Sequence, residues 1–340
     1  MIIEGFALET TDDLIFTVKG LLHPPGRVIA YLRYVPDSGG ARVRNGVRYR
    51  RLYQFEAQEA TLANQHPTYL AEDPVFGLRL QSVPCRSVRT VYDPRRYLAM
   101  LGERGPEDSL EEDALALTAL LQTTADVPGE TLGVSGSLML GLHQSDSDLD
   151  LIVYGERASR SVHESLRCLL DQGDGRLRHP TRQELAVLHA EHRPDTPLLF
   201  EEFARLQTRK VNELRFAGRE TFVRFVKLPD DVEERYGDRR FESLGPVEVR
   251  ARVIDDDDAI FTPCRYGIEG VTFLDGGPAP DPQEIVSYRG RFSDQVRGGE
   301  WAVARGQLER VVGRDGTLSH RLVVGGKAGD YLLAQEHSRV

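Results

Sequence analysis

Two groups of residues that lie close together in the sequence could do chemistry on a phosphate-bearing substrate. Gly136-Ser137 ends a short apolar run, and Asp148-Leu149-Asp150 opens a second apolar run at 151–154. Side chains at positions i and i+2 of a strand share a face, so we expect the two aspartates side by side and the intervening leucine in the core. Carboxylates this close repel each other unless a cation lies between them. The pair therefore predicts a cation site at one end of a strand.

The expected cation is Mg²⁺ or Mn²⁺, because such ions bind one or two carboxylates together with substrate phosphates. Gly136 and Ser137 would receive those phosphates if a helix begins there. The free N–H groups and the dipole of a helix start attract an anion, glycine permits close approach, and the serine hydroxyl adds a donor. A metal clamp and a phosphate cradle would then face each other across two neighbouring strands.

Gly-Ser, a spacer and Asp-x-Asp on a hydrophobic strand resemble the signature of the nucleotidyltransferase superfamily with the DNA polymerase β-like fold. The resemblance covers residues 131–155, and the layout of the whole chain is similar to a branch of predicted nucleotidyltransferases. It implies that Gly136 and Ser137 contact a nucleoside triphosphate and that Asp148 and Asp150 hold the metal. It also implies a third carboxylate on a neighbouring strand.

Two other interpretations of the aspartates deserve comparison. A Ser-Asp-Ser-Asp loop before a strand is also typical of a solvated turn, and this alternative stays open. An EF-hand would place Asp146, Asp148 and Asp150 at loop positions one, three and five. The required glycine then falls on Leu151 and the bidentate acid on Arg157, which excludes that motif.

Glu220 is the first candidate for the third carboxylate. It is the only acid of the expected strand 220–226 and shares a face with Phe222 and Arg224. There it could share the metal or accept the proton of an attacking hydroxyl. Asp255 and Glu248, on a later expected strand, are weaker candidates. Without a third acid, the chain would bind nucleotide with little transfer. The alternative function is an idle nucleotidyltransferase fold that binds RNA or DNA through its C-terminal barrel and the basic residues at 205–227.

Arginines and lysines gather at 205–227, where seven basic and two acidic residues give +5 in a chain of net charge −10. This basic island predicts that Arg209, Lys210 and Arg224 bind the triphosphate or a nucleic-acid backbone. Pairing of these cations with neighbouring acids is the alternative. The overall negative charge argues against a protein that coats nucleic acid non-specifically.

The positioning elements form three expected domains of a multidomain α+β protein. Residues 1–104 are expected to form a β-rich module with strands at 14–19, 28–35 and 47–53. The arginines of this module, at positions 42, 44, 48, 50 and 51, are interpreted as a solvated strand face, with phosphate contact as the alternative. Residues 105–228 form the central α/β nucleotidyltransferase domain, with helices at 94–101 and 108–124 leading into it, the latter capped by Ser109 and Glu112. Further helices are expected at 159–172, 182–190 and 198–209. Residues 242–334 predict a five-stranded β-barrel of the oligonucleotide-binding (OB) type.

The sequence thus favours an Mg²⁺-dependent enzyme that moves a nucleoside monophosphate from an NTP, such as ATP, to a hydroxyl acceptor. A nucleic-acid acceptor, RNA more than DNA, fits the flanking β domains better than a small molecule, and label transfer to a polypeptide is a third interpretation. No apolar run has transmembrane length and the start lacks the form of a signal peptide, so a cytoplasmic protein without a membrane partner is expected. Three scattered cysteines support neither disulfides nor a zinc site.

Overall fold

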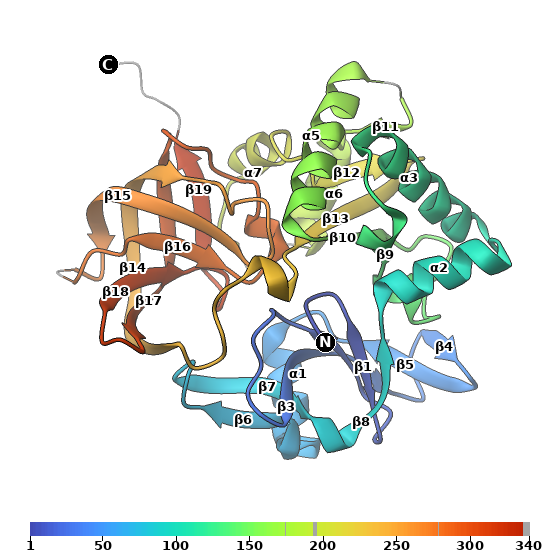
Figure 1. The fold of residues 1–340 in the computed structure, drawn as a ribbon, viewed down its shortest axis with the longest axis horizontal. Helices are drawn as coiled ribbons and strands as arrows, with labels where there is room; N and C mark the ends of the chain where they lie inside the picture. Colours follow the sequence, from blue (N-terminus) through green and yellow to red (C-terminus); the bar gives the residue numbers. More distant parts are fainter. Residues whose placement is uncertain (174, 193–195, 278, 336–340) are drawn as a thin grey trace. The chain divides into compact units, whose positions relative to one another are not determined.

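The structure is a computed structural model that describes residues 1–173, 175–192, 196–277 and 279–335. The described residues form a mixed α+β fold with three sheets (Figure 1). The chain divides into two compact units. The first comprises Met1–Ser165 and Phe216–Tyr236, and the second comprises Leu166–Arg215 and Gly237–Val340. None of the described helices combines the length and apolar character that crossing a membrane requires.

The N-terminal part of the first unit is a sheet of order β4-β5-β3-β2-β1-β8, with β7 pairing β3 and β6. The three expected strands are present as β2, β3 and β5, whereas the other strands and helix α1 lack a clear sequence signal. The bounds are β1 Ala7–Thr10, β2 Ile15–Val18, β3 Arg27–Pro36, β4 Arg42–Arg44, β5 Val47–Arg51, α1 Phe55–Gln65, β6 Leu70–Asp73, β7 Leu78–Pro84 and β8 Val88–Tyr92.

Strand β3 contains a bulge at Arg33. Ile15 of β2 pairs with Tyr34, whereas the next residue, Phe16, pairs with Leu32, so Arg33 is the extra residue. A bulge interrupts the alternation of side chains and re-aims the residues around it. Accordingly, Leu32 and Tyr34 lie in two different hydrophobic clusters although they are two positions apart.

The strands expected to carry the Gly-Ser group and the aspartates are present in the same unit. Helix α2 (Pro94–Arg104) and helix α3 (Ser109–Ala125) precede β9 (Leu132–Val134), the short helix α4 (Gly136–Met139) and β10 (Leu149–Tyr154). Helix α5 (Glu156–Gln172) follows, and β13 (Arg219–Val226) completes this part. The predicted capping box of α3 is wrong: Asp108 is the N-cap, and its Oδ1 accepts hydrogen bonds from the amides of Leu110 and Glu111, each at 2.9 Å.

The N-terminal sheet shares hydrophobic clusters with strands β10 and β13 and with α4 inside the first unit. Ile152 and Tyr154 of β10 and Val226 of β13 pack in one cluster with Phe16 and Leu32. A second cluster joins residues of the N-terminal sheet to the turn after Gly136-Ser137; its buried members are Ala7, Ile15, Tyr34, Tyr49, Met139, Leu140 and Leu142. The N-terminal sheet therefore has no separate core of its own.

The second unit contains short elements followed by a curved sheet. Its strands β14 to β18 close on themselves in the order β14-β15-β16-β18-β17, because β17 also pairs β14. These strands are orange to red in Figure 1, and their core includes Val249, Tyr266 and Leu308. The bounds are β11 Leu177–Arg178, α6 Arg182–His192, α7 Phe200–Gln207, β12 Glu213–Phe216, β14 Arg239–Asp255, β15 Cys264–Asp275, β16 Glu284–Ser287, β17 Trp301–Gly313, β18 Leu318–Val323 and β19 Tyr331–Gln335.

Candidate active site

Strand β10 brings the two predicted sequence groups together. It pairs antiparallel with β9, where Leu151 lies opposite Val134, and parallel with β13, where Asp150 lies opposite Phe222. Just beyond β9, the amide of Ser135 donates a hydrogen bond of 2.9 Å to the carbonyl of Asp150. The Gly-Ser group therefore begins directly beside Asp150.

Gly136 makes the closest approach in the site. Its φ of +67° lies in the left-handed region that favours glycine. A Cβ placed on Gly136 would lie 2.0 Å from Oδ2 and 2.9 Å from Cγ of Asp150. No other residue type fits between the backbone and this carboxylate without displacing one of them.

Ser137 carries a buried hydroxyl that lacks a partner. The residue is 4% exposed, and its Oγ has no hydrogen-bond partner in the described part of the chain. Unsatisfied buried polar groups are uncommon and cost free energy, so a missing ligand is one physical explanation. A helix begins at Gly136 as expected, but this helix, α4, spans only four residues. The groups that could contact a phosphate here are therefore the Ser137 hydroxyl and the backbone of Gly136, without the dipole of a long helix.

The charge of Asp148 acts on Asp150. Burial raises the pKa of Asp150 to about 6, and the negative charge of Asp148 adds to this increase. A divalent cation would relieve both effects, because it replaces lost solvation and screens the repulsion. Two hard oxygen ligands of this kind fit Mg²⁺ that also binds substrate phosphates.

Arg224 is the first cation that acts on Asp150. It lies on β13 opposite Ile152, two positions from the Phe222–Asp150 pair, so it shares the face of the aspartate. Its Nη1 is also 2.8 Å from Oε1 of Glu4, a buried carboxylate that additionally pairs with Lys19 at 3.1 Å. Arg224 is thus held in place by an ion pair within the first unit.

Arg51 and Arg33 of the N-terminal sheet also act on Asp150, and neither is among the site residues predicted from the sequence. Their guanidinium carbons lie 4.5 and 5.3 Å from the ring centre of Tyr53, which is 59% exposed. Burial and the neighbouring charge of Arg51 lower the pKa of Arg33 to about 10. The run of arginines around Arg51 is visible in the sequence, but its solvated-face interpretation holds only for residues such as Arg48 and Arg50, which are exposed.

Glu220 belongs to β13 and lies one position before Thr221, which pairs with Leu149. Continuing this register sets Glu220 opposite Asp148. Within the described ranges, however, no group of three or more His, Cys, Asp or Glu side chains is arranged to hold a metal ion. The weaker candidates for the third carboxylate, Asp255 and Glu248, lie in the second unit. There Asp255 is 2.7 Å from Arg265, and Glu248 is 3.4 Å from Arg305.

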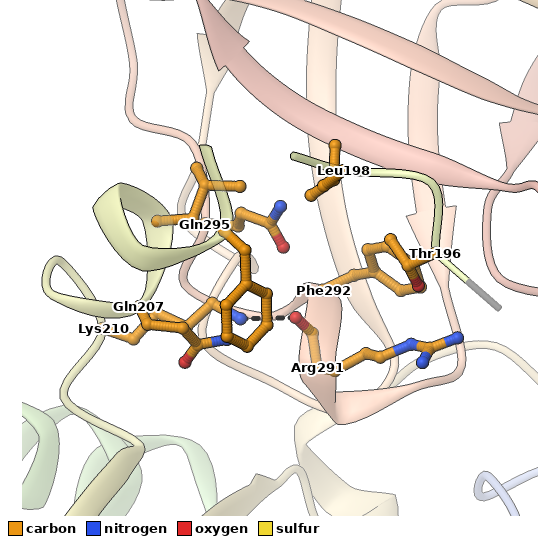
Figure 2. A pocket seen from close by; sticks show the side chains of 9 residues that line it. Thr196, Leu198, Gln207, Lys210, Arg291, Phe292 and Gln295 are labelled. Carbon is orange, nitrogen blue, oxygen red and sulfur yellow. Dashed lines mark hydrogen bonds between the residues drawn. The ribbon is translucent and has the colours of Figure 1, made fainter. Parts of the chain in front are cut away.

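Arg209 and Lys210 belong to the second unit. Arg209 pairs with Glu300 at 2.8 Å, and Lys210 is buried beside Glu213 at 3.3 Å and donates to the carbonyl of Arg291 (Figure 2). Lys210 lines a cavity of about 20 Å³, which is room for about one water molecule rather than a nucleotide.

The basic island is therefore not a patch of unpaired charge. Three more of its cations pair with acids: Arg215 with Glu184 at 3.6 Å, Arg219 with Asp113 at 2.7 Å and Lys227 with Glu156 at 3.6 Å. These pairs correspond to the alternative in which neighbouring acids neutralise the island. The composition of the segment could not reveal them, because most partners are distant in sequence.

The chain is similar to a protein from the archaeon Methanocaldococcus jannaschii, the uncharacterized protein MJ1086. The two are 30% identical over 326 residues, which cover 94% of each chain. No family model matches the chain, and no solved structure matches it. Identity at this level over nearly the whole length of both proteins shows that the chain belongs to the same protein family as MJ1086.

Proposed function

We propose that this protein is a metal-dependent nucleotidyltransferase that moves a nucleoside monophosphate from an NTP to a hydroxyl acceptor. The observation that carries the proposal is the contact between Gly136 and Asp150, because it sets the bare backbone of the Gly-Ser group directly against a carboxylate pair. The unpartnered hydroxyl of Ser137 supports it. A solvated turn would require neither the close approach nor the buried hydroxyl.

The residues have distinct roles in this proposal. Asp148 and Asp150 would hold Mg²⁺ or Mn²⁺, which when bound neutralises charge on the triphosphate. Ser137 would donate its hydroxyl to an outer phosphate. Glu220 would accept the proton of the attacking hydroxyl, since the register of β13 sets it on the side of Asp148. Catalysis would come mainly from positioning and from fixed charge.

The strand arrangement supports the finer fold assignments of the proposal. A polymerase β-like core needs the Gly-Ser group and the Asp-x-Asp strand on adjacent strands, and β9 and β10 are adjacent. An OB-like barrel fits the closed order β14-β15-β16-β18-β17 with parallel pairing of β16 and β18. Such a barrel is consistent with a nucleic-acid acceptor, preferably an RNA end, although fold alone does not give function.

The test is transfer of label from α-³²P NTPs with Mg²⁺ and a mixture of RNA oligonucleotides. We expect label on RNA with the wild type and its loss in Asp148→Ala and Asp150→Ala. Asp146→Ala is the matched control, because Asp146 lies in the same loop with an exposed side chain. Label on the protein itself would change the acceptor to a polypeptide.

A second candidate function is an idle fold that binds RNA or DNA without transfer. It is favoured by the missing three-carboxylate group among the residues that the structure describes. RNA binding with no incorporation from any NTP, in Mg²⁺ or Mn²⁺, would establish this candidate and contradict the enzymatic one.

A further inference from the structure

We infer that Arg33 and Arg51 of the N-terminal sheet bind the phosphates of the incoming NTP, opposite Ser137 and the two aspartates. This inference rests on the proposed function and extends it, because the N-terminal sheet then supplies one wall of the substrate site. Four features support it: the partners of the two arginines, their position on the sheet, the packing of this sheet against the turn after Ser137 and the charge balance of the site.

The two arginines lack the partners that the other cations near the site possess. Arg224 pairs with Glu4, and Arg44 pairs with Glu9 at 3.2 Å. By contrast, neither Arg33 nor Arg51 has a carboxylate within ion-pair distance among the described residues, and Nε of Arg51 is buried with no hydrogen-bond partner there. A partly buried guanidinium without such a partner is costly, and a phosphate would provide the missing acceptors.

The position of the two arginines on the sheet sets them in the electrostatic field of the aspartates. Arg51 pairs across the sheet with Tyr34, and Arg33 precedes Tyr34 at the bulge of β3. Asp148 and Asp150 both act on the charge of each arginine. Tyr53 contacts both guanidinium groups with its ring and so restricts where they can lie. Two cations of equal charge are thus held together beside two anions.

The N-terminal sheet is fixed against the phosphate-binding turn. Tyr34 and Tyr49 pack in one cluster with Met139, Leu140 and Leu142, which closely follow Ser137. Arg42 of β4 also donates a hydrogen bond to the carbonyl of Leu142. The arginine pair and the serine hydroxyl are therefore parts of one packed arrangement and do not depend on a flexible linker.

A site that holds both a metal ion and a triphosphate also needs cations from the protein, such as Arg33 and Arg51. The aspartates already neutralise much of the charge of any metal that they hold, so the triphosphate still needs positive charge from the protein. In the ligand-free protein, the arginines offset the aspartates. When metal ions occupy the aspartates, the arginines become available to the phosphates.

Equilibrium binding of inorganic tripolyphosphate in Mg²⁺ tests the inference, because this probe needs neither the correct base nor turnover. Arg33→Gln and Arg51→Gln are each expected to raise its Kd at least about tenfold, and Arg→Lys variants are expected to lose less. The matched control is Arg50→Gln on the same strand, since Arg50 is exposed and pairs with Asp37 at 2.6 Å. Circular dichroism establishes that each variant is folded.

The possible outcomes separate the inference from the function on which it rests. Unchanged tripolyphosphate affinity in both Gln variants, with a wild type that binds, would overturn the inference alone. Loss confined to a 5′-phosphorylated RNA, with tripolyphosphate unaffected, would also overturn it and assign the arginines to the acceptor. A wild type that binds neither tripolyphosphate nor any NTP would overturn the proposed function, and the inference with it.

Discussion

Gly136 lies so close to Asp150 that a single methyl group on its Cα would collide with the carboxylate, 2.0 Å from Oδ2. The two residues belong to neighbouring elements of the fold, so this contact is a product of the pairing of β9 with β10. It turns two local sequence patterns into one site. The contact also provides the most direct handle for testing that site.

Gly136→Ala is expected to destabilise the protein and abolish triphosphate binding, because the new methyl group must displace Asp150. Gly141→Ala is the matched control: Gly141 has a similar φ of +63°, but nothing lies within 4 Å of the position that its new methyl group would occupy. The control carries only the backbone penalty of about 1–2 kcal/mol. Thermal unfolding and tripolyphosphate binding of both variants give the comparison, and equal losses would contradict the contact.

Ser137→Ala should leave the ligand-free protein as stable as the wild type or more stable by up to about 1 kcal/mol, since it removes an unsatisfied buried hydroxyl. Its triphosphate affinity should fall about threefold to tenfold. Ser147→Ala is expected to destabilise the protein and to leave its triphosphate affinity unchanged, because Oγ of Ser147 is buried and accepts a hydrogen bond of 2.9 Å from the amide of Gln144. Denaturant unfolding and isothermal titration measure both effects. A Ser137→Ala variant that unfolds easily but binds normally would refute the assigned role.

Asp150→Asn should stabilise the metal-free protein at pH 7.5 but not near pH 4. The pKa of Asp150 is raised from 3.8 to about 6 in the folded protein, so ionisation costs folding free energy as the pH rises through this window. Near pH 4 the folded state is protonated and the unfolded state is only about half ionised, so most of the cost is absent; well above pH 6 the cost is complete, about 3 kcal/mol. Melting temperatures at several pH values, with exposed Asp146→Asn as control, check the dependence. A pH-independent difference would contradict it.

Mg²⁺ should raise the melting temperature of the wild type at pH 7.5, because it binds the folded aspartate pair and not the unfolded chain. Asp148→Asn and Asp150→Asn should show no such increase, and Asp146→Asn should retain it. Differential scanning fluorimetry with and without the metal, at constant ionic strength, measures the shift. The same increase in all four proteins would show that the metal acts elsewhere.

Glu220→Gln should lower the rate of nucleotidyl transfer about 10²-fold to 10⁴-fold while leaving the Kd for tripolyphosphate unchanged, as expected for a group that accepts a proton. Single-turnover transfer and equilibrium binding separate the two quantities. Glu248→Gln and Asp255→Asn serve as comparisons, because these acids pair with Arg305 and Arg265 in the second unit. Loss of transfer in either of them, with Glu220→Gln active, would assign the third carboxylate differently.

The elements around the aspartates could be predicted because their signals are local. The apolar stripe of α3, including Leu110, Leu117 and Leu121, is buried as expected, and the run at 151–154 forms the end of β10. Hydrophobic spacing and short polar groups are sufficient for such elements. The polymerase β-like and OB-like assignments and the catalytic role of each residue remain predictions.

The arginine pair could not be predicted, because its position depends on long-range pairing and on an irregularity. Regular alternation would put the side chains of Arg33 and Tyr34 on opposite faces of β3, and the bulge opposite β2 interrupts this alternation. Arg224 shows a second limit of prediction from sequence, because its ion pair could not be foreseen. Its charge suggested an open phosphate site, whereas Glu4, 220 positions away, already pairs with it. The local composition of a segment does not reveal ion pairs with residues so far away in the sequence.

The hydrophobic clusters common to the N-terminal sheet and to strands β10 and β13 restrict how this protein can be shortened or recombined. A truncated version that starts after residue 104 would expose Ile152, Tyr154 and Val226 to water, and it would aggregate. For the same reason, homologues cannot exchange this N-terminal segment as an independent cassette. The segment and the strands that it covers must be inherited together, and substitutions on one side of the interface constrain those on the other.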